Sequence, residues 1–256
     1  MEEHFSQYRT LSTNNICYKV FHLSGEKNQS RVNCAKKIRS TLELNELTSS
    51  TVLIEGLESL KEFISNYPQF KIDPDGYDPF YTRLKLEYSK NNAKPIGWLY
   101  QELGIWASSY LAYKEFLNST YDYLIIFEDD LMIKNNFLSL LDFYMTELPE
   151  DWDVFYQYSQ LPPLFYGKSV SEHLCTPYTT SSNAAYVVNK NSAKKIIDDI
   201  EKEGISLPID WHLLRQPNRF KSYAIQVGFD KGCDVAKTMS TYAVGPLTRY
   251  KLHGLL

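Results

Sequence analysis

Three consecutive carboxylates, Glu128, Asp129 and Asp130, directly follow the apolar run 123–127. Adjacent carboxylates repel one another and raise one another's pKa, and a divalent cation between their oxygens relieves that repulsion. A metal held in this way at the end of a strand indicates a substrate that carries phosphate. The alternative is an acidic loop in which one carboxylate caps a helix that begins near Asn135. We favour the metal-binding interpretation.

Strand patterns alternate with helix patterns along the chain, and the strands and helices that they predict must position the acidic triplet. Strands are predicted at 16–23, 51–54, 123–127, 152–158, 177–180 and 184–189, and helices from about 26 to 44 and at 57–67, 98–117, 136–148, 192–203 and 210–214. Such alternation predicts an α/β sheet that is parallel at least in its first half. Because the sequence shows no repeat, low-complexity tract or linker, we predict one domain over 1–256, with 1–14 loosely ordered.

Ligands in open α/β sheets bind beyond the carboxyl ends of the strands. Both the acidic triplet and the Ser24-Gly25 turn after the first strand fall at such ends. The sequence contains neither a GxGxxG fingerprint nor a GxxxxGK[ST] loop, which argues against a dinucleotide-binding unit and a P-loop nucleotidase. Phosphate binding through a metal held by carboxylates therefore remains the leading interpretation.

Composition narrows the class of protein further. The chain has 256 residues, of which 43% are hydrophobic, and this is enough to bury a sizeable core. It lacks an apolar run of roughly 18 residues, and 1–13 has no apolar centre, so we predict a cytoplasmic protein without a transmembrane segment. The four cysteines are scattered, which predicts neither a zinc site nor a disulfide framework. A net charge of -4 argues against a nucleic-acid partner.

The C-terminal Arg249 and Lys251, near three leucines, would allow peripheral contact with an anionic membrane; the alternative is a frayed end.

Three blocks of sequence carry a resemblance to a known family. They are 101–116 (QELGIWASSYLAYKEF), 121–130 (YDYLIIFEDD) and 148–154 (LPEDWDV). In order and spacing they resemble glycosyltransferase family 25, which contains lipooligosaccharide galactosyltransferases and related collagen galactosyltransferases. The blocks 184–188 and 192–197 and the tripeptide Pro208-Ile209-Asp210 extend this similarity, which spans roughly 16–230. The chain departs from the family at Gln101, Ile105 and Ser109, where Gly, Cys and His are usual.

The resemblance implies a GT-A fold, with a Rossmann-like, mostly parallel central sheet flanked by helices. It also implies a uridine diphosphate (UDP) sugar donor whose diphosphate is bridged by Mn²⁺ or Mg²⁺. Asp130 is the first choice as metal ligand, with Glu128 or Asp129 assisting, because a metal stabilises the charge on the leaving diphosphate. His212 is a candidate for a further ligand, and the alternative for it is an ordinary core or surface histidine.

An inverting displacement, which the resemblance also implies, needs a base to take the proton of the acceptor hydroxyl. Asp210 and Glu102 are the candidates; the alternatives are a helix N-cap for Asp210 and a solvent-facing charge for Glu102. The remaining residues expected to bind the donor are Ser24, Arg31, Gln101, Glu128, Asp129 and Tyr77. Among them, Arg31 would pair with the diphosphate, and Tyr77 lies in a loop rich in Pro, Gly and Asp that is suited to ligand contact.

We therefore expect a metal-dependent enzyme that transfers galactose or glucose from a UDP-sugar to a glycan or lipid-linked saccharide acceptor, as in lipopolysaccharide biosynthesis. The alternatives are a DNA-base or protein glycosyltransferase, a non-catalytic nucleotide-sugar-binding protein, and a metal-dependent phosphohydrolase. A DNA-modifying enzyme would need a strongly basic face, which the net charge of -4 argues against. A phosphohydrolase would leave the family-like blocks around 101–130 unexplained.

Overall fold

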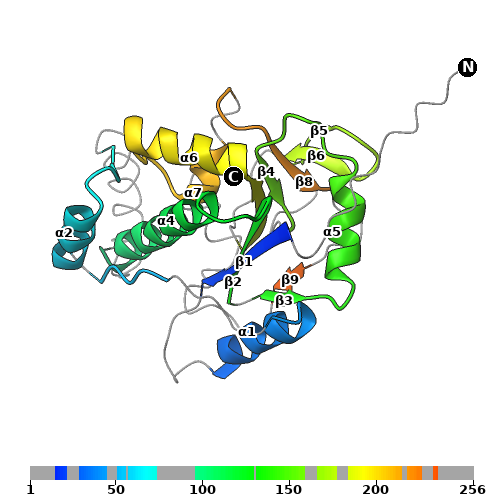
Figure 1. Cartoon of the computed structure of the whole chain (residues 1–256), viewed down its shortest axis with the longest axis horizontal. Helices are drawn as coiled ribbons and strands as arrows, with labels where there is room; N and C mark the ends of the chain where they lie inside the picture. Colours follow the sequence, from blue (N-terminus) through cyan, green and yellow to red (C-terminus); the bar gives the residue numbers. More distant parts are fainter. Residues whose placement is uncertain are drawn as a thin grey trace, which may run out of the picture.

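A computed structural model describes residues 15–21, 29–44, 51–55, 57–73, 96–129, 131–158, 166–177, 184–214, 218–226 and 233–235. In this part of the chain, a seven-stranded sheet ordered β1-β2-β7-β4-β8-β6-β5 lies between helices (Figure 1), and β3 pairs with β9 in a separate ribbon. The strands are β1 (Ile16–Phe21), β2 (Tyr123–Glu128), β3 (Leu131–Ile133), β4 (Val154–Tyr156), β5 (Tyr166–Ser169), β6 (Leu174–Pro177), β7 (Ala185–Asn189), β8 (Ser222–Ile225) and β9 (Cys233–Val235). The helices are α1 (Gln29–Thr41), α2 (Leu57–Asn66), α4 (Ile96–Leu117), α5 (Phe137–Met145), α6 (Lys190–Lys202) and α7 (Ile209–Leu214).

β2 is buried on both of its faces, as its unbroken apolar sequence predicts. Leu124 and Ile126 point into one core cluster, whereas Ile125 and Phe127 point into the other. None of these four side chains is more than 1% exposed. The strand that was predicted to end at Phe127 is thus confirmed, and it extends by one residue to Glu128.

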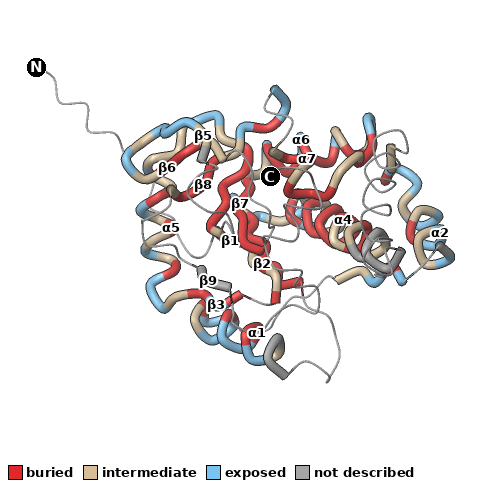
Figure 2. Tube along the Cα trace, turned by 180° about the vertical axis from the view of Figure 1, so that it is seen from behind, coloured by how far each residue is buried: buried red, intermediate tan, exposed pale blue. Residues whose placement is uncertain are grey.

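The helices form two layers, one on each face of the sheet. α2, α4, α6 and α7 contribute side chains such as Trp106 and Ile196 to the first core cluster. α1 and α5, together with β3, contribute side chains such as Ile38 and Leu141 to the second. Figure 2 shows the buried residues concentrated on β2, β7 and the inner part of α4. The α/β class predicted from the sequence is confirmed.

α6 shows how the local sequence sets the bounds of an element. The Asn189 side chain caps its first turn by accepting a hydrogen bond from the Ser192 backbone N–H at 2.9 Å. Gly204 follows its end with φ +85°, a left-handed conformation that favours glycine. A Cβ on Gly204 would also lie 3.0 Å from the Asp73 backbone nitrogen, so the glycine permits the bridge between Ile72 and Ile205.

The sheet is mixed rather than mostly parallel, which corrects the expectation from the resemblance. In the described residues, β1–β2 and β4–β8 are parallel, whereas β2–β7, β4–β7, β5–β6 and β6–β8 are antiparallel. A parallel pair needs a crossover of a dozen or more residues, as α1 to α4 provide between β1 and β2. β5 and β6 are joined by only a short turn, so they pair as an antiparallel hairpin.

The strand predicted at 51–54 is wrong. Among the described residues, no strand pairs with this segment, and the Val52 N–H donates instead to the Ser108 hydroxyl of α4 at 2.7 Å. Gly104 allows the close approach, because a Cβ there would lie 2.8 Å from the Val52 carbonyl oxygen. The sequence prediction also missed β3, β5, β8 and β9, and it overlaps β6 only at Pro177. Residues 1–14 and most of the predicted strand at 177–180 lie outside the described residues.

Candidate functional site

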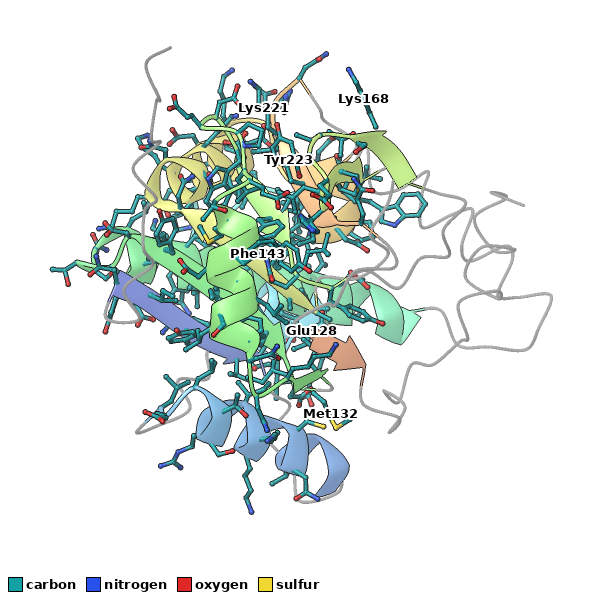
Figure 3. The ribbon with its side chains drawn as sticks, turned by 90° about the vertical axis from the view of Figure 1, so that its right-hand side faces the viewer. Glu128, Met132, Phe143, Lys168, Lys221 and Tyr223 are labelled. Carbon is teal, nitrogen blue, oxygen red and sulfur yellow. The ribbon has the colours of Figure 1, made fainter. Side chains whose placement is uncertain are left out.

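Glu128 and Asp129 lie where β1 and β2 end together. Phe21 of β1 pairs with Glu128 in parallel register, and the Asp129 N–H donates to the Phe21 carbonyl oxygen at 3.1 Å. On the other side, the Glu128 N–H donates to the Ala184 carbonyl oxygen at 2.8 Å. Asp129 is only 2% exposed, whereas Glu128 is half-buried. Figure 3 labels Glu128 and, below it, Met132 of β3. The backbone therefore fixes both carboxylates at the carboxyl edge of the sheet, as the sequence predicts.

A pair of buried tyrosines lies on the same face of the sheet as Glu128. The hydroxyls of Tyr186 in β7 and Tyr113 in α4 are 2.8 Å apart. Burial raises the pKa of Tyr186, and the Glu128 carboxylate raises it further. Burial and the neighbouring Tyr186 likewise raise the pKa of Tyr113 well above its usual value. Both phenols thus stay protonated at neutral pH and remain able to donate hydrogen bonds next to a carboxylate.

Sequence reasoning missed this tyrosine pair, although each residue belongs to an element that it predicted. The two residues are 73 positions apart, and neither has a local signature that sets it apart from an ordinary core tyrosine. Only the packing of α4 on β7 brings them together.

α4 runs antiparallel to β2, so its N-terminal half reaches toward the carboxyl edge of the sheet. Near its C-terminal end, Glu115 accepts a hydrogen bond from Lys19 of β1 at 2.6 Å. One helix face carries Glu102, Trp106 and Tyr113, at spacings of four and seven residues. Since Tyr113 on this face contacts β7, Glu102 lies farther along the same face toward that edge. Glu102 is half-buried and therefore not a fully solvent-facing charge.

A hydrogen bond from α4 holds the residue that lies two positions before α7. The Trp106 indole N–H donates to the Leu207 carbonyl oxygen at 2.8 Å. Asp210, which is 7% exposed, lies in the first turn of α7, and its carboxylate accepts a hydrogen bond from the Trp211 N–H at 3.0 Å. Since α7 begins at Ile209, Asp210 follows the N-cap position rather than occupying it. Trp106, one turn after Glu102, thus joins the helix that carries Glu102 to the helix that carries Asp210.

His212 is engaged within the core. Its Nε2 lies 2.8 Å from Asp199 Oδ2 in α6, and its ring, which is 1% exposed, packs edge-on against Trp106 at 5.2 Å. Arg219 donates to the other oxygen of Asp199. Burial alone would raise the pKa of Asp199, but the hydrogen bonds and charges of His212 and Arg219 outweigh it and lower that pKa. This arrangement argues against His212 as a metal ligand and favours the core histidine that was the alternative.

The other expected site residues lie wholly or partly outside the described part of the chain. Asp130, Ser24 and Tyr77 lie outside the described residues. Arg31 and Gln101 fall within α1 and α4, but their side chains also lie outside the described part. Among the side chains that are described, no three His, Cys, Asp or Glu residues cluster in a way that could hold a metal ion. Nor does any described helix have the length and apolarity needed to cross a membrane.

Comparison with protein families confirms the resemblance. Residues 88–213, just under half of the chain, match the family model described as glycosyltransferase family 25 (LPS biosynthesis protein). The matched segment runs from before α4 into α7 and includes Glu102, the acidic triplet and Asp210; Ser24, Arg31 and Tyr77 precede it. No curated protein matches the chain. The segment that carries the carboxylates at the end of β2 is thus similar to glycosyltransferase family 25.

Proposed function

We propose that this protein transfers a hexose, galactose or glucose, from a UDP-sugar to a saccharide acceptor on a glycan or a lipid. The observation that carries the proposal is the position of Glu128 and Asp129 at the carboxyl ends of adjacent parallel strands, inside the glycosyltransferase segment. This edge is where open α/β sheets bind their ligands. A diphosphate needs neutralising charge there, and acidic side chains supply it only through a cation.

A divalent metal fits the residue types at this edge. Mn²⁺ and Mg²⁺ prefer oxygen ligands, and Glu128 offers a half-buried carboxylate immediately before Asp129 and Asp130. We assign Asp130 as the principal ligand, with Glu128 or Asp129 assisting. When bound, the metal would act as a Lewis acid that stabilises the charge on the leaving diphosphate. Ser24, Arg31, Gln101 and Tyr77 remain proposed contacts to the donor.

The reaction we propose is an inverting displacement. The acceptor hydroxyl attacks the anomeric carbon, the bond from that carbon to the diphosphate oxygen breaks, and a carboxylate takes the proton. Glu102 and Asp210 are the candidate bases. Asp210 is the more buried of the two and already accepts one backbone hydrogen bond, whereas Glu102 lies on the α4 face that leads toward the carboxyl edge.

The test is donor turnover with matched variants at the two ends of β2. UDP release from a panel of nucleotide sugars would be measured with and without Mn²⁺ for wild type, Asp130→Ala and Asp122→Ala. Asp122 is an exposed carboxylate at the amino end of the same strand, so it serves as the control. We expect Mn²⁺-dependent release from one UDP-hexose, lowered by roughly 10²–10³-fold in Asp130→Ala and unchanged in Asp122→Ala.

Two further variants identify the base. Replacing it with the matching amide, Glu102→Gln or Asp210→Asn, should lower kcat by roughly 10²–10⁴-fold while donor binding stays intact.

Equal loss in Asp122→Ala and Asp130→Ala would refute the site. If no nucleotide sugar binds to the wild type with Mn²⁺ present, the glycosyltransferase proposal itself fails.

A further inference from the structure

Two glutamines end neighbouring parallel strands at the carboxyl edge of the sheet. Gln157 follows β4 and Gln226 follows β8. The Gln226 Nε2 lies within hydrogen-bonding distance of the Ser169 hydroxyl at 2.7 Å and of the Leu174 carbonyl oxygen at 2.9 Å. The Gln157 side chain is 1% exposed, and neither its Nε2 nor its Oε1 makes a hydrogen bond to any described residue. Within the described part of the chain, the Gln226 amide therefore has hydrogen-bond partners and the Gln157 amide has none.

An unsatisfied buried amide destabilises a folded protein, because it loses its hydrogen bonds to water and gains none in return. A methionine of similar length would fill the same space without that cost. Buried polar groups nearly always have a partner in the protein, in ordered water or in a ligand, so an amide that has none among the described residues leaves room for one of the latter two. Gln157 lies at the edge where open α/β sheets bind their ligands, and this position favours a ligand group as the partner.

The position of Gln157 relates it to the acidic triplet. Its backbone N–H donates to the Ala185 carbonyl oxygen at 3.0 Å, and the Glu128 N–H donates to the adjacent Ala184 carbonyl oxygen at 2.8 Å. β4 and β2 flank β7, so their backbones are separated by two strand spacings, roughly 10 Å. Side-chain alternation puts Gln157 on the same face as Phe155 and Phe127, the face on which Asp129 follows.

We infer that the Gln157 amide binds two hydroxyl groups of the donor hexose and thereby contributes to the choice of sugar. The inference rests on the proposed function. A primary amide offers one acceptor and one donor group, which match a pair of ring hydroxyls that can each donate or accept. The separation between β2 and β4 suits a hexosyl phosphate whose phosphate lies near Glu128 and Asp129. A buried group of this kind discriminates strongly, because a sugar that misplaces one hydroxyl leaves the amide unpaired again.

Gln157→Met and Gln226→Met form a matched pair for the test. The affinities of UDP, UDP-galactose and UDP-glucose would be measured by calorimetry with Mn²⁺, together with Tm in the absence of ligand. We expect Gln157→Met to bind UDP like the wild type, to lose roughly ten- to hundredfold in affinity for the preferred UDP-hexose, and to discriminate less between the two sugars. Its Tm should be unchanged or higher. Gln226→Met should lower Tm and leave the ratio of UDP-hexose to UDP affinity unchanged.

Several results would overturn the inference. If Gln157→Met unfolds, or loses as much in Tm as Gln226→Met, the amide is satisfied inside the protein, for example by a buried water. If it keeps the wild-type ratio of UDP-hexose to UDP affinity, the amide does not contact the donor sugar, even if acceptor turnover falls. These results leave the glycosyltransferase proposal standing, whereas a wild type that binds neither UDP nor any UDP-hexose removes both.

Discussion

His212→Ala should destabilise the protein strongly, because the imidazole joins α7 to α6 in the core. The substitution removes the 2.8 Å interaction with the Asp199 carboxylate, and hydrogen bonds to charged groups contribute about 1.5–3 kcal/mol. It also removes the ring contacts with Trp106 at 5.2 Å and Phe220 at 6.2 Å, which contribute about 0.5–1.5 kcal/mol each. Arg219 continues to neutralise Asp199, which limits the loss. We expect a destabilisation of about 3–4 kcal/mol and a fall in Tm of roughly 10 °C.

Urea denaturation of three variants separates the two contributions. His212→Gln keeps a side-chain nitrogen able to donate to Asp199 but lacks the ring, whereas His212→Phe keeps a ring but lacks the hydrogen bond. Each should lose less stability than His212→Ala. His212→Gln should also retain Mn²⁺-dependent binding of UDP, because the imidazole contacts the Asp199 carboxylate. A His212→Ala protein that loses less than about 1 kcal/mol, yet no longer shows Mn²⁺-dependent binding of UDP, would refute this reasoning and make the ring a metal ligand.

Three further predictions concern stability. Gly204→Ala should cost about 1–2 kcal/mol in urea denaturation, because it forces a side chain into a left-handed conformation 3.0 Å from the Asp73 nitrogen; unchanged stability would contradict this. Ser108→Ala leaves the Val52 N–H without its acceptor, so the exchange of that amide hydrogen should accelerate, with Ser40→Ala on the exposed face of α1 as the control. The lowered pKa of Asp199 contributes stability that is present above its unfolded pKa, about 3.9, and is lost as pH falls through the folded pKa. Asp199→Asn should therefore flatten the decline in stability below about pH 4, and an identical acid profile would count against the ion pair.

The sequence predicted correctly those elements whose own residues show which of their faces are buried. β2 reads as a buried strand because residues on both of its faces are apolar, and α6 reads as a helix because Ala193, Ile196, Ile197 and Ile200 form one stripe. The same reasoning gave the wrong result at 51–54, where β-branched residues suggested a strand. There the backbone partner is the Ser108 hydroxyl, and nothing in the segment itself reveals that partner.

The residues of the candidate site also differ in whether a local sequence signal reveals them. Glu128 and Asp129 could be found from sequence because a run of carboxylates after an apolar strand is a local signal. Strand directions could not be found in this way, since β7 lies antiparallel between β2 and β4 and brings Gln157 within two strands of the triplet. Gln157 therefore carries no signal in its own neighbourhood. It becomes conspicuous only when its missing hydrogen bonds are compared with those of Gln226.

The choice between Glu102 and Asp210 as base depends on how Trp106 couples α4 to α7. The Trp106 indole fixes the Leu207 carbonyl just before α7, and its ring packs on His212 two residues after Asp210. Glu102 lies one turn before Trp106 on the same helix face, and Tyr113, farther along that face, contacts Tyr186 near Glu128. The indole thus joins α4, which carries Glu102, to α7, which carries Asp210, and disturbing Trp106 would change the position of one acid relative to the other. Isosteric amide substitutions, which leave Trp106 and its contacts in place, are for this reason the changes that can tell the two acids apart.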